Sequence, residues 1–475
     1  MVQPTLTVLT SEQIQQTHAY ALQILAQTGV RVDSPRARQI FAAADGATLD
    51  DDRVLLNPSL VDWAIRSAPS QLDIYNRHGE PAFSLGSSSA RFGIGVTNLY
   101  YQDPASDAVT PFARQHMALS VRLGGSLPQF DLVSTIGIIQ DLPQTIADLY
   151  AALEMTANTL KPLVLLISDE NLFVPMLDML EHLHGDLAER PFLLPYFNPV
   201  TPLVMNAGTT DKMQSAIERG LPFIYSNYGM VGMSTPITPA GTLSLLIAEL
   251  LAGLTLSQLI KEGAPVVLGS LPAYFDMKGM VDYYDPLTFV LNLACAEMMV
   301  YYQIPHAGTS GSGLGWGPDL VAGGLLWLDH LTTCLGNVGL APFVGGNLGS
   351  KAFSPALAVY ANDVVEQARR FAAGFAFDET QVGLDEIHQA GPGGDFLTAG
   401  LTLERFRKDY YTSQVFPRLN LETWQEKGQP QAVQYLRERT VQLLAQAAPP
   451  DDQAELLARG EAFITRRMQE VDKNR

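Results

Sequence analysis

One stretch of the sequence, residues 222–286, constrains the fold more than any other. It contains two short apolar runs, Pro222–Tyr225 and Ala264–Gly269, with the length and composition of buried strands. Between them, Gly241–Lys261 is apolar and long enough for a helix of several turns. A strand, a helix and a second strand in this order form the repeating unit of a parallel sheet. The chain is therefore expected to be an α/β protein.

Further apolar runs of strand length recur on both sides of this unit, each followed by a helical pattern. They are Phe92–Val96, Asp131–Ile139, Pro162–Ile167, Pro191–Phe197, Gln303–Ala307 and Leu340–Val344. Together with the two central runs they make eight strands, each followed by a helix, which favours an eight-stranded α/β barrel of the TIM type. An open doubly wound sheet is the alternative, because a strand count made from sequence can miss a strand.

The barrel is expected to occupy residues 89–377, with an addition at each end. Residues 1–88 predict a mixed α+β accessory region, in which Leu72–Tyr75 and Ala82–Leu85 alternate polar and apolar residues and can pair as a hairpin. Residues 378–475 are helical and charged and predict a C-terminal helical extension.

Composition and local sequence disfavour a nucleic-acid partner, a metal site and a membrane location. The formal net charge of −19 disfavours a nucleic-acid partner, because an acidic surface repels phosphates. The cysteines, Cys295 and Cys334, lie in apolar helical patterns without a CxxC motif, so no metal site is expected. No signal peptide is expected, because residues 1–16 contain neither a basic nor a long apolar segment, and the apolar run Leu243–Ile260 contains Glu249 and several polar residues. A cytoplasmic protein without membrane contact is expected.

Aromatic residues and carboxylates follow several of the predicted strands. In a barrel such residues gather at the carboxyl ends of the strands, where binding sites form, and aromatic faces bind organic cations. Any one of these rings could instead pack in the core or at an interface and bind no ligand. The candidate rings are Tyr100, Tyr101, Tyr225, Tyr228, Tyr274, Phe275 and Trp316, and Tyr283 and Tyr284 follow the second central strand. The leading carboxylates are Asp103 and Asp276, followed by Asp285 and by Asp319, which also has the pattern of a helix cap.

A ligand that also carries a carboxylate needs hydrogen-bond donors or positive charge. His306 follows a predicted strand directly and is as consistent with a structural role as with a binding role. The other candidates are Asn227, Thr309, Ser310 and Asn347. Lys278 and Lys351 could supply positive charge, although lysines in loops are usually solvated.

Three long segments resemble the trimethylamine methyltransferase (MttB) family. They are TGVRVDSPRARQIFAAADGATLDDDRVLLNPSLVDWAI, STPITPAGTLSLLIAELLAGLTLSQLIKEGAPVVLG and GPGGDFLTAGLTLERFRKDYYTSQVFPR. The resemblance covers nearly the whole chain. It implies a TIM barrel that transfers a methyl group from a methylated amine to the cobalt of a corrinoid, which a partner protein carries. No cofactor is expected to bind this chain tightly. The implied partners are the amine, the corrinoid protein and further copies of this chain in a homo-oligomer.

Two departures from the family pattern narrow this expectation. Members that act on trimethylamine carry pyrrolysine in a late βα segment, whereas the corresponding region, Asp319–Leu331, contains only standard residues. The chain therefore resembles the quaternary-amine members, with glycine betaine as first candidate and proline betaine, carnitine, γ-butyrobetaine, choline or trimethylamine as alternatives. Asp395 stands where the family often has histidine, so no role is carried over to it.

The chemistry agrees with the absence of pyrrolysine. A quaternary ammonium loses a methyl group to Co(I) by in-line displacement, and a neutral tertiary amine leaves. No catalytic acid, base or covalent adduct is expected of the protein, which only binds, orients and desolvates the substrate. The glycine runs Gly308–Gly317 and Gly345–Gly349 would allow a flat macrocycle to approach closely, and tight turns are an equally good interpretation of them. The alternative to a methyltransferase is a protein that binds methylated amines without catalysing a reaction.

Overall fold

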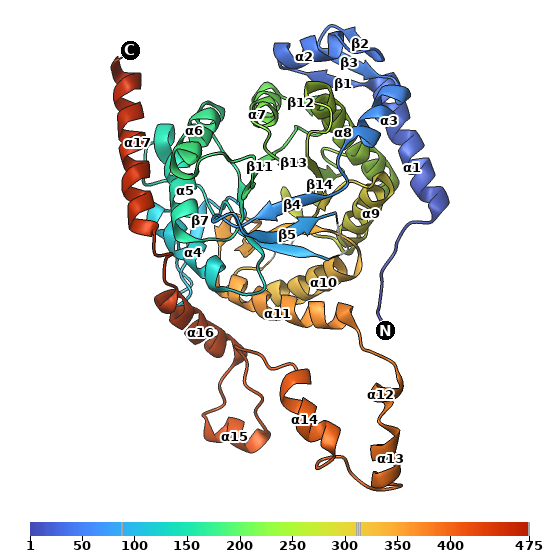
Figure 1. Cartoon of the computed structure of the whole chain (residues 1–475), viewed down its shortest axis with the longest axis vertical. Helices are drawn as coiled ribbons and strands as arrows, with labels where there is room; N and C mark the ends of the chain where they lie inside the picture. Colours follow the sequence, from blue (N-terminus) through green and yellow to red (C-terminus); the bar gives the residue numbers. More distant parts are fainter. Residues whose placement is uncertain (87–88, 310, 312, 314, 474–475) are drawn as a thin grey trace.

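The centre of the molecule is a closed barrel of eight parallel strands (Figure 1). The structure, a computed structural model, describes residues 1–86, 89–309, 311, 313 and 315–473. The strands, in order around the ring, are β6 (Arg91–Ile94), β9 (Leu132–Ser134), β10 (Leu163–Leu165), β11 (Leu193–Phe197), β13 (Phe223–Val231), β14 (Val266–Asp276), β16 (His306–Ala307) and β17 (Leu340–Val344). β17 pairs with β6 and closes the ring, so the predicted TIM barrel is confirmed and the open sheet is excluded.

A long helix follows each barrel strand, and the eight helices surround the barrel (Figure 1). They are α4 (Arg114–Ser126), α5 (Gln144–Asn158), α6 (Phe173–His184), α7 (Ala207–Glu218), α8 (Pro239–Ile260), α9 (Pro286–Tyr302), α10 (Leu320–Leu335) and α11 (Pro355–Ala373). A short 3-10 turn, η2 (Glu170–Leu172), precedes α6.

Side chains of the barrel strands alternate between two cores, because successive residues of a strand point to opposite faces. On β13, Ile224 packs inside the barrel with Val267 and Leu340. Its neighbour Tyr225 points outward to α8, where a β-carbon on Gly253 would lie 2.1 Å from its ring. This alternation decides which strand-end residues reach the centre of the barrel.

The apolar helix α8 is buried on all sides. Every residue from Thr242 to Gln258 is buried, since α1, α2 and α3 cover the side that faces away from the strands. Of the helices that the structure describes, α8 alone has the length and apolar composition to cross a membrane, but 89% of its most apolar window is buried. These contacts identify it as a core helix of the barrel, as its polar residues predict.

Besides the packing of α1, α2 and α3 on α8, the N-terminal region contacts the barrel through β1 and through a hairpin. Its elements are α1 (Ser11–Gln23), a π-helical turn η1 (Ile24–Thr28), β1 (Val30–Val32), α2 (Pro35–Ala42), β2 (Ala47–Asp50), β3 (Arg53–Leu56), α3 (Pro58–Ser67), β4 (Leu72–Tyr75) and β5 (Pro81–Leu85). β1 pairs with β12 (Val204–Met205), which belongs to the loop after β11. β4 and β5 form the predicted hairpin, and its apolar face (Leu72, Ile74, Phe83 and Leu85) closes the amino end of the barrel.

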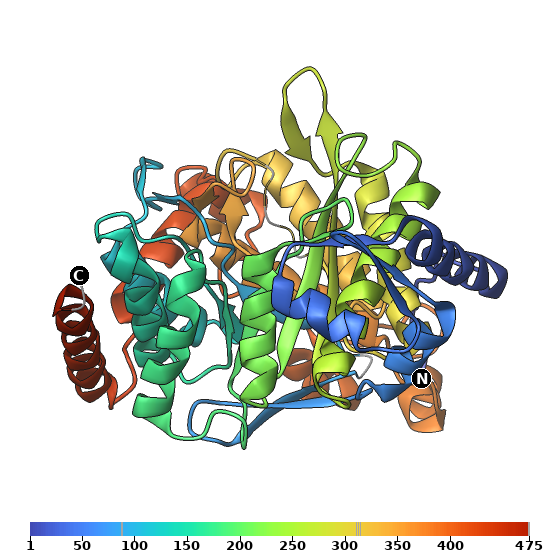
Figure 2. The ribbon, with the colours of Figure 1, turned by 90° about the horizontal axis from the view of Figure 1, so that it is seen from above.

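Short strands build a rim at the other end of the barrel. They are β7 (Tyr100–Gln102), β8 (Val109–Pro111), β15 (Val281–Tyr283), β18 (Gly346–Asn347) and β19 (Ala352–Phe353). β15 turns back on the long strand β14, and this hairpin rises above the rim, opposite the β4–β5 hairpin (Figure 2). The carboxyl ends of the strands therefore open toward the β14–β15 hairpin.

The C-terminal residues form an arm and two helices that return to the barrel. The elements are α12 (Glu379–Val382), α13 (Leu384–Ala390), α14 (Gly400–Asp409), α15 (Leu421–Glu426), α16 (Ala432–Gln446) and α17 (Gln453–Lys473). The segment that carries α12 to α15 extends away from the body (Figure 1). α16 packs on α11 and α4, and α17 packs on α5 and α6.

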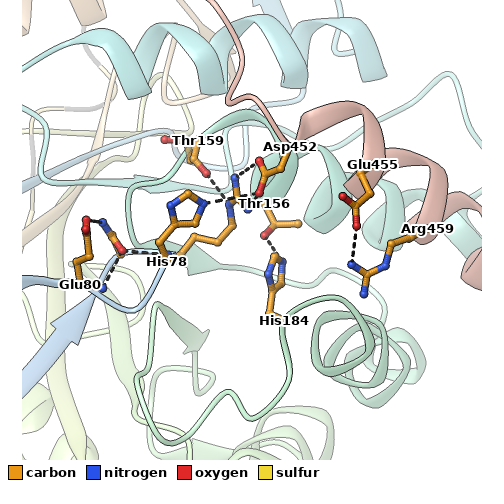
Figure 3. A network of polar contacts seen from close by, with 10 residues as sticks. His78, Glu80, Thr156, Thr159, His184, Asp452, Glu455 and Arg459 are labelled. Carbon is orange, nitrogen blue, oxygen red and sulfur yellow. Dashed lines mark hydrogen bonds and ion pairs between the residues drawn. The ribbon is translucent and has the colours of Figure 1, made fainter.

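A polar network fastens α17 to the amino end of the barrel (Figure 3). Arg77, in the turn of the β4–β5 hairpin, donates to both carboxylate oxygens of Asp452 at 2.6 and 2.7 Å. His78 approaches the same carboxylate at 3.7 Å, and Arg459 of α17 donates to the carbonyl of His182 at 2.9 Å. The network therefore joins the first and last parts of the chain.

Candidate functional site

A cavity of about 460 Å³ lies at the carboxyl ends of the barrel strands, the position of active sites in barrels of this type. Residues from at least six strands or the loops that follow them contribute to its wall. The lining residues are Val96, Thr97, Leu99, Leu166, Tyr196, Asn198, Tyr228, Leu271, Asp282, Tyr284, Thr309, Phe343, Gly349, Ser350 and Lys351.

Four aromatic rings line this cavity, and the register of the strands points them inward. Tyr196 of β11 and Phe343 of β17 are buried, with ring centroids 5.0 Å apart in an edge-to-face arrangement. Tyr228 lies on β13 at even spacing from Ile224, and therefore on the inner face. Tyr284 follows β15, and its hydroxyl accepts a hydrogen bond from Thr309 at 3.3 Å. The four rings form what we call the aromatic cage.

One carboxylate reaches the cage from the β14–β15 hairpin. Asp282 is on β15, opposite Phe275 of β14, and accepts a hydrogen bond from the Tyr228 hydroxyl at 2.7 Å. Burial raises the pKa of Tyr228, and the bond to Asp282 raises it further. Burial also raises the pKa of Tyr196 and of Tyr284. The three phenols therefore stay protonated and serve as ring faces and donors, not as bases.

A cation and neutral polar groups line the same cavity. Lys351 is exposed at its edge, and its backbone carbonyl accepts hydrogen bonds from the amides of Leu99 and Tyr100, which fixes the loop that carries it. Asn198 donates to the carbonyl of Ser226 at 2.7 Å, which holds its amide at the wall. The cavity thus combines aromatic faces and a carboxylate with a separate positive charge, a combination that suits a zwitterion.

A family model described as trimethylamine methyltransferase (MTTB) matches residues 2–472, nearly the entire chain. The chain belongs to this family. Membership places it among the methyltransferases, and it agrees with the resemblance that three segments of the sequence carry.

Individual relatives agree with this assignment over most of their length. Glycine betaine methyltransferase of Desulfitobacterium hafniense (strain Y51) is 26% identical over 479 residues, a match that covers 98% of both chains. Trimethylamine methyltransferase MttB of Desulfitobacterium hafniense (strain DSM 10664 / DCB-2) is 27% identical over 447 residues, covering 92% of this chain and 89% of the relative. The crystal structure of the Methanosarcina barkeri monomethylamine methyltransferase (MtmB) has a TM-score of 0.54 at 8% identity, covering 94% and 89% of the two chains, and shows the shared fold.

The structure brings together only some of the residues that the sequence suggested for this member of the MttB family. The cavity at the carboxyl ends of the strands, which we call the mouth cavity, is lined by three of them: Tyr228, Thr309 and Lys351. None of the eleven principal candidates is among the described residues that line it: Tyr100, Tyr101, Asp103, Tyr225, Asn227, Tyr274, Phe275, Asp276, His306, Trp316 and Asn347. Ser310 lies outside the described residues.

Tyr225 and Asn227 differ from expectation because they lie on the outer face of β13. Tyr225 is fully buried between the strands and α8. Asn227 donates to Glu249 of α8 at 2.9 Å and to the carbonyl of Leu246, and it accepts from Ser270 at 2.8 Å. Both side chains therefore join the barrel to α8 and do not reach the cavity.

The candidates after β6 belong to the rim sheet instead of the cavity. Tyr101 is buried and stacks on His116 with ring centroids 4.2 Å apart, while Tyr100 is exposed to solvent. Asp103 accepts hydrogen bonds from the amides of Ala105 and Ser106 and stabilises the turn between β7 and β8. Tyr101 and Asp103 therefore contribute to the local structure of the rim.

The candidates after β14 shape the hairpin that carries Asp282. Asp276 accepts hydrogen bonds from the amides of Lys278 and Gly279 and so holds the turn. Tyr274 and Phe275 are half-buried, and the ring of Tyr274 lies 6.1 Å from that of Tyr283. Phe275 pairs with Asp282 across the hairpin, so all three residues belong to the element that positions this carboxylate, and none of them is among the described residues that line the cavity.

The remaining candidates are also placed away from the cage. His306 points outward at the start of β16, with Nδ1 2.8 Å from the carbonyl of Val338, and burial lowers its pKa to about 4. Trp316 is 73% exposed. The side-chain amide of Asn347 lies 2.6 Å from that of Gln102 in the rim. Asp285 and Asp319 cap α9 and α10, which confirms the helix-cap pattern of Asp319.

Tyr284, which the sequence placed after the second central strand, lines the cavity, whereas three other residues of its wall were not singled out from the sequence: Tyr196, Asp282 and Phe343. Tyr196 and Phe343 lie within apolar strand runs, where a ring has the pattern of core. The available signal was the alternation of side chains along β11. Tyr196 is two residues after Leu194, so both side chains point into the barrel. Among the described residues, no cluster of three or more His, Cys, Asp or Glu side chains is placed to hold a metal ion.

Proposed function

We propose that this methyltransferase removes a methyl group from a quaternary amine, with glycine betaine as first substrate, and transfers it to the cobalt of a corrinoid carried by a partner protein. One observation carries the proposal: the aromatic cage and Asp282 share a single cavity with Lys351. A trimethylammonium group fits the rings and the carboxylate, and a carboxylate fits the lysine.

The cage suits a cation that loses its charge during the reaction. Each ring contributes about 0.5–2 kcal/mol to binding of the cation, depending on desolvation. The hydrogen bond from Tyr228 spreads the charge of Asp282, so the carboxylate does not hold the ground-state cation in a tight ion pair. A diffuse site of this kind favours the transition state, in which the positive charge on nitrogen disappears.

The residues of this chain orient the substrate, and the corrinoid would supply the nucleophile when bound. Gly349 and Lys351 line the cavity and are exposed, and a β-carbon on Gly349 would meet no atom within 4 Å. This open edge supports access by a flat macrocycle from outside. The tertiary amine leaves as a neutral molecule, so the protonated phenols of the cage need not transfer a proton.

The test is anaerobic mixing of the protein with Co(I)-cobalamin and glycine betaine, followed by the absorbance of methyl-Co(III). The same assay with proline betaine, carnitine, γ-butyrobetaine, choline and trimethylamine identifies the preferred substrate. Binding measured by calorimetry without any methyl transfer would favour the non-catalytic alternative. Absence of both binding and transfer for every amine would overturn the proposal.

We also propose that further copies of this chain cover the C-terminal arm. No residue between Phe371 and Tyr435 is buried, although Phe377, Leu397 and Leu403 are 71%, 77% and 59% exposed. Short helices without a core do not offset the entropy of ordering the chain. A permanent interface is more apolar than a transient one, which favours a second copy over a corrinoid protein that must dissociate. The basic residues of α14 (Arg405, Arg407 and Lys408) would face a chain of net charge −19.

The oligomer has a direct test in sedimentation. Wild-type protein is expected to sediment as a dimer or larger assembly, and Leu397→Glu with Phe377→Glu to sediment as a monomer. A monomeric wild type would contradict the arm interface without affecting the proposed reaction.

A further inference from the structure

A buried carboxyl group lies directly behind one wall of the mouth cavity. Asp329 of α10 is 1% exposed, and neither of its oxygens has a hydrogen-bond partner among the described residues. It lines a small second cavity together with Phe289, Gly311 and Tyr284. Tyr284 lines the mouth cavity as well. Tyr284, one ring of the aromatic cage, therefore lies between Asp329 and the mouth cavity.

An unpartnered buried carboxyl group requires an explanation, because its ionised form is costly without a nearby cation. Burial raises the pKa of Asp329 to about 7, and the nearby Thr333 hydroxyl offsets part of the rise. His330 is next to it on α10, but burial lowers the pKa of this histidine to about 3, so it carries no charge. Near neutral pH, Asp329 is therefore present in both its protonated and its ionised form.

Other charged or titratable groups near Asp329 do not neutralise it. Tyr284 and Cys334 are neutral, since burial raises the pKa of Tyr284 and raises that of Cys334 to about 12. Arg369 of α11 is the nearby cation, but it donates to Asp131 at 2.6 Å and is held by that ion pair. Among the described residues, the protein therefore provides no free positive charge to neutralise Asp329.

We propose that Asp329 is a specificity-determining residue that supplies a second negative charge for a quaternary ammonium group bound in the aromatic cage, acting through the ring of Tyr284. The inference rests on the proposed function and extends it. Asp282 contacts the cage directly, whereas Asp329 acts from behind it. A bound cation stabilises the ionised form of Asp329, and the ionised form in turn strengthens binding of the cation.

The proposal fixes the direction of the pH dependence. Below pH 6 the carboxyl group is protonated and contributes no charge, so affinity for the cation is low. As pH rises through the pKa of Asp329 the affinity increases, and binding releases a proton in that range. If the cation lowers this pKa by about one unit, the affinity at high pH exceeds that at low pH by about tenfold.

Calorimetric titration of the full-length protein with glycine betaine, between pH 5 and pH 9, tests the inference. Two buffers of different ionisation enthalpy measure the number of protons released. Glycine betaine is a suitable probe, because its ammonium group does not titrate and its carboxyl group titrates well below pH 5. Wild type is expected to bind about tenfold more tightly at pH 9 than at pH 5. Asp329→Asn is expected to bind with one affinity throughout and to release no proton.

Two comparisons separate this inference from the proposed function. Asp282→Asn is expected to weaken binding at every pH while keeping the rise of affinity with pH. Thermal unfolding of each variant shows that the fold is intact, and a purely structural role of Asp329 would not remove a pH profile. Wild-type binding without pH dependence, or a pH profile that survives Asp329→Asn, would overturn this inference alone. Failure of wild type to bind would overturn the proposed function together with it.

Discussion

Tyr225 and Tyr228 of β13 offer the sharpest test of the site, because they are three residues apart and point to opposite faces of one strand. Tyr228→Leu removes an aromatic face and the hydroxyl that donates to Asp282 at 2.7 Å. Tyr225→Phe removes only a hydroxyl that is buried without a hydrogen-bond partner. The first change should affect binding of the cation, and the second should affect stability alone.

The expected size of each effect follows from the surroundings of each ring. Tyr228 is half-buried, so loss of its cation–π contact costs about 1–2 kcal/mol, which raises Kd for glycine betaine about 5- to 30-fold. Tyr225→Phe deletes an unsatisfied buried hydroxyl, so the free energy of unfolding stays constant or rises by up to about 1 kcal/mol. Its Kd should equal that of wild type.

Isothermal calorimetry gives Kd, and urea unfolding gives the free energy of unfolding. Tyr100→Leu is the matched control for Tyr228→Leu, since it makes the same chemical change at an exposed tyrosine outside the cavity. Tyr228→Phe keeps the ring and should weaken binding less than Tyr228→Leu does. The assignment of the inner face would be refuted if Tyr225→Phe or Tyr100→Leu weakened binding as much as Tyr228→Leu.

Four further predictions concern the contacts that hold the barrel together. Gly253→Ala on α8 should lower the free energy of unfolding by about 1–3 kcal/mol, because its β-carbon would lie 2.1 Å from a buried tyrosine ring. Gly324→Ala on α10 has no atom within 4 Å and should raise stability by about 0.5–1 kcal/mol in the same urea titration. Burial raises the pKa of Glu249 from 4.5 to about 6, so folding favours its protonated form. The resulting stabilisation is complete below pH 4.5 and lost as pH rises through 6, and urea titrations across this range should show a fall of about 2 kcal/mol that Glu249→Gln abolishes. Asp452→Asn leaves the buried guanidinium of Arg77 without its counter-charge and should lower the thermal midpoint, at a cost of about 2–3 kcal/mol because Asp452 itself is 36% exposed.

The sequence was sufficient to predict the barrel. Each of the eight strands is an apolar run followed by a helical pattern, and local hydrophobic periodicity reports such units directly. The hairpin at the amino end of the barrel was likewise predicted from alternation within Leu72–Tyr75 and Ala82–Leu85. The helix cap at Asp319 followed from local residue preferences in the same way.

The members of the candidate site were not predictable to the same degree. Tyr225 and Tyr228 are both aromatic residues at the end of one predicted strand, yet only Tyr228 lines the cavity. Tyr196 and Phe343 have the sequence context of core residues, and they line the cavity because they lie on inner faces near the carboxyl ends of their strands. Asp282 enters the site only because β15 folds back on β14.

The sequence by itself therefore determined which segments become strands and helices, their order, and the end of the barrel at which a site can form. The tertiary structure alone decided which side chains meet there. The physical reason is that apolar runs reveal burial but not direction: a strand buried on both faces is apolar at every position. Closure of the ring then sets the register that turns one residue toward the cavity and its neighbour toward a helix.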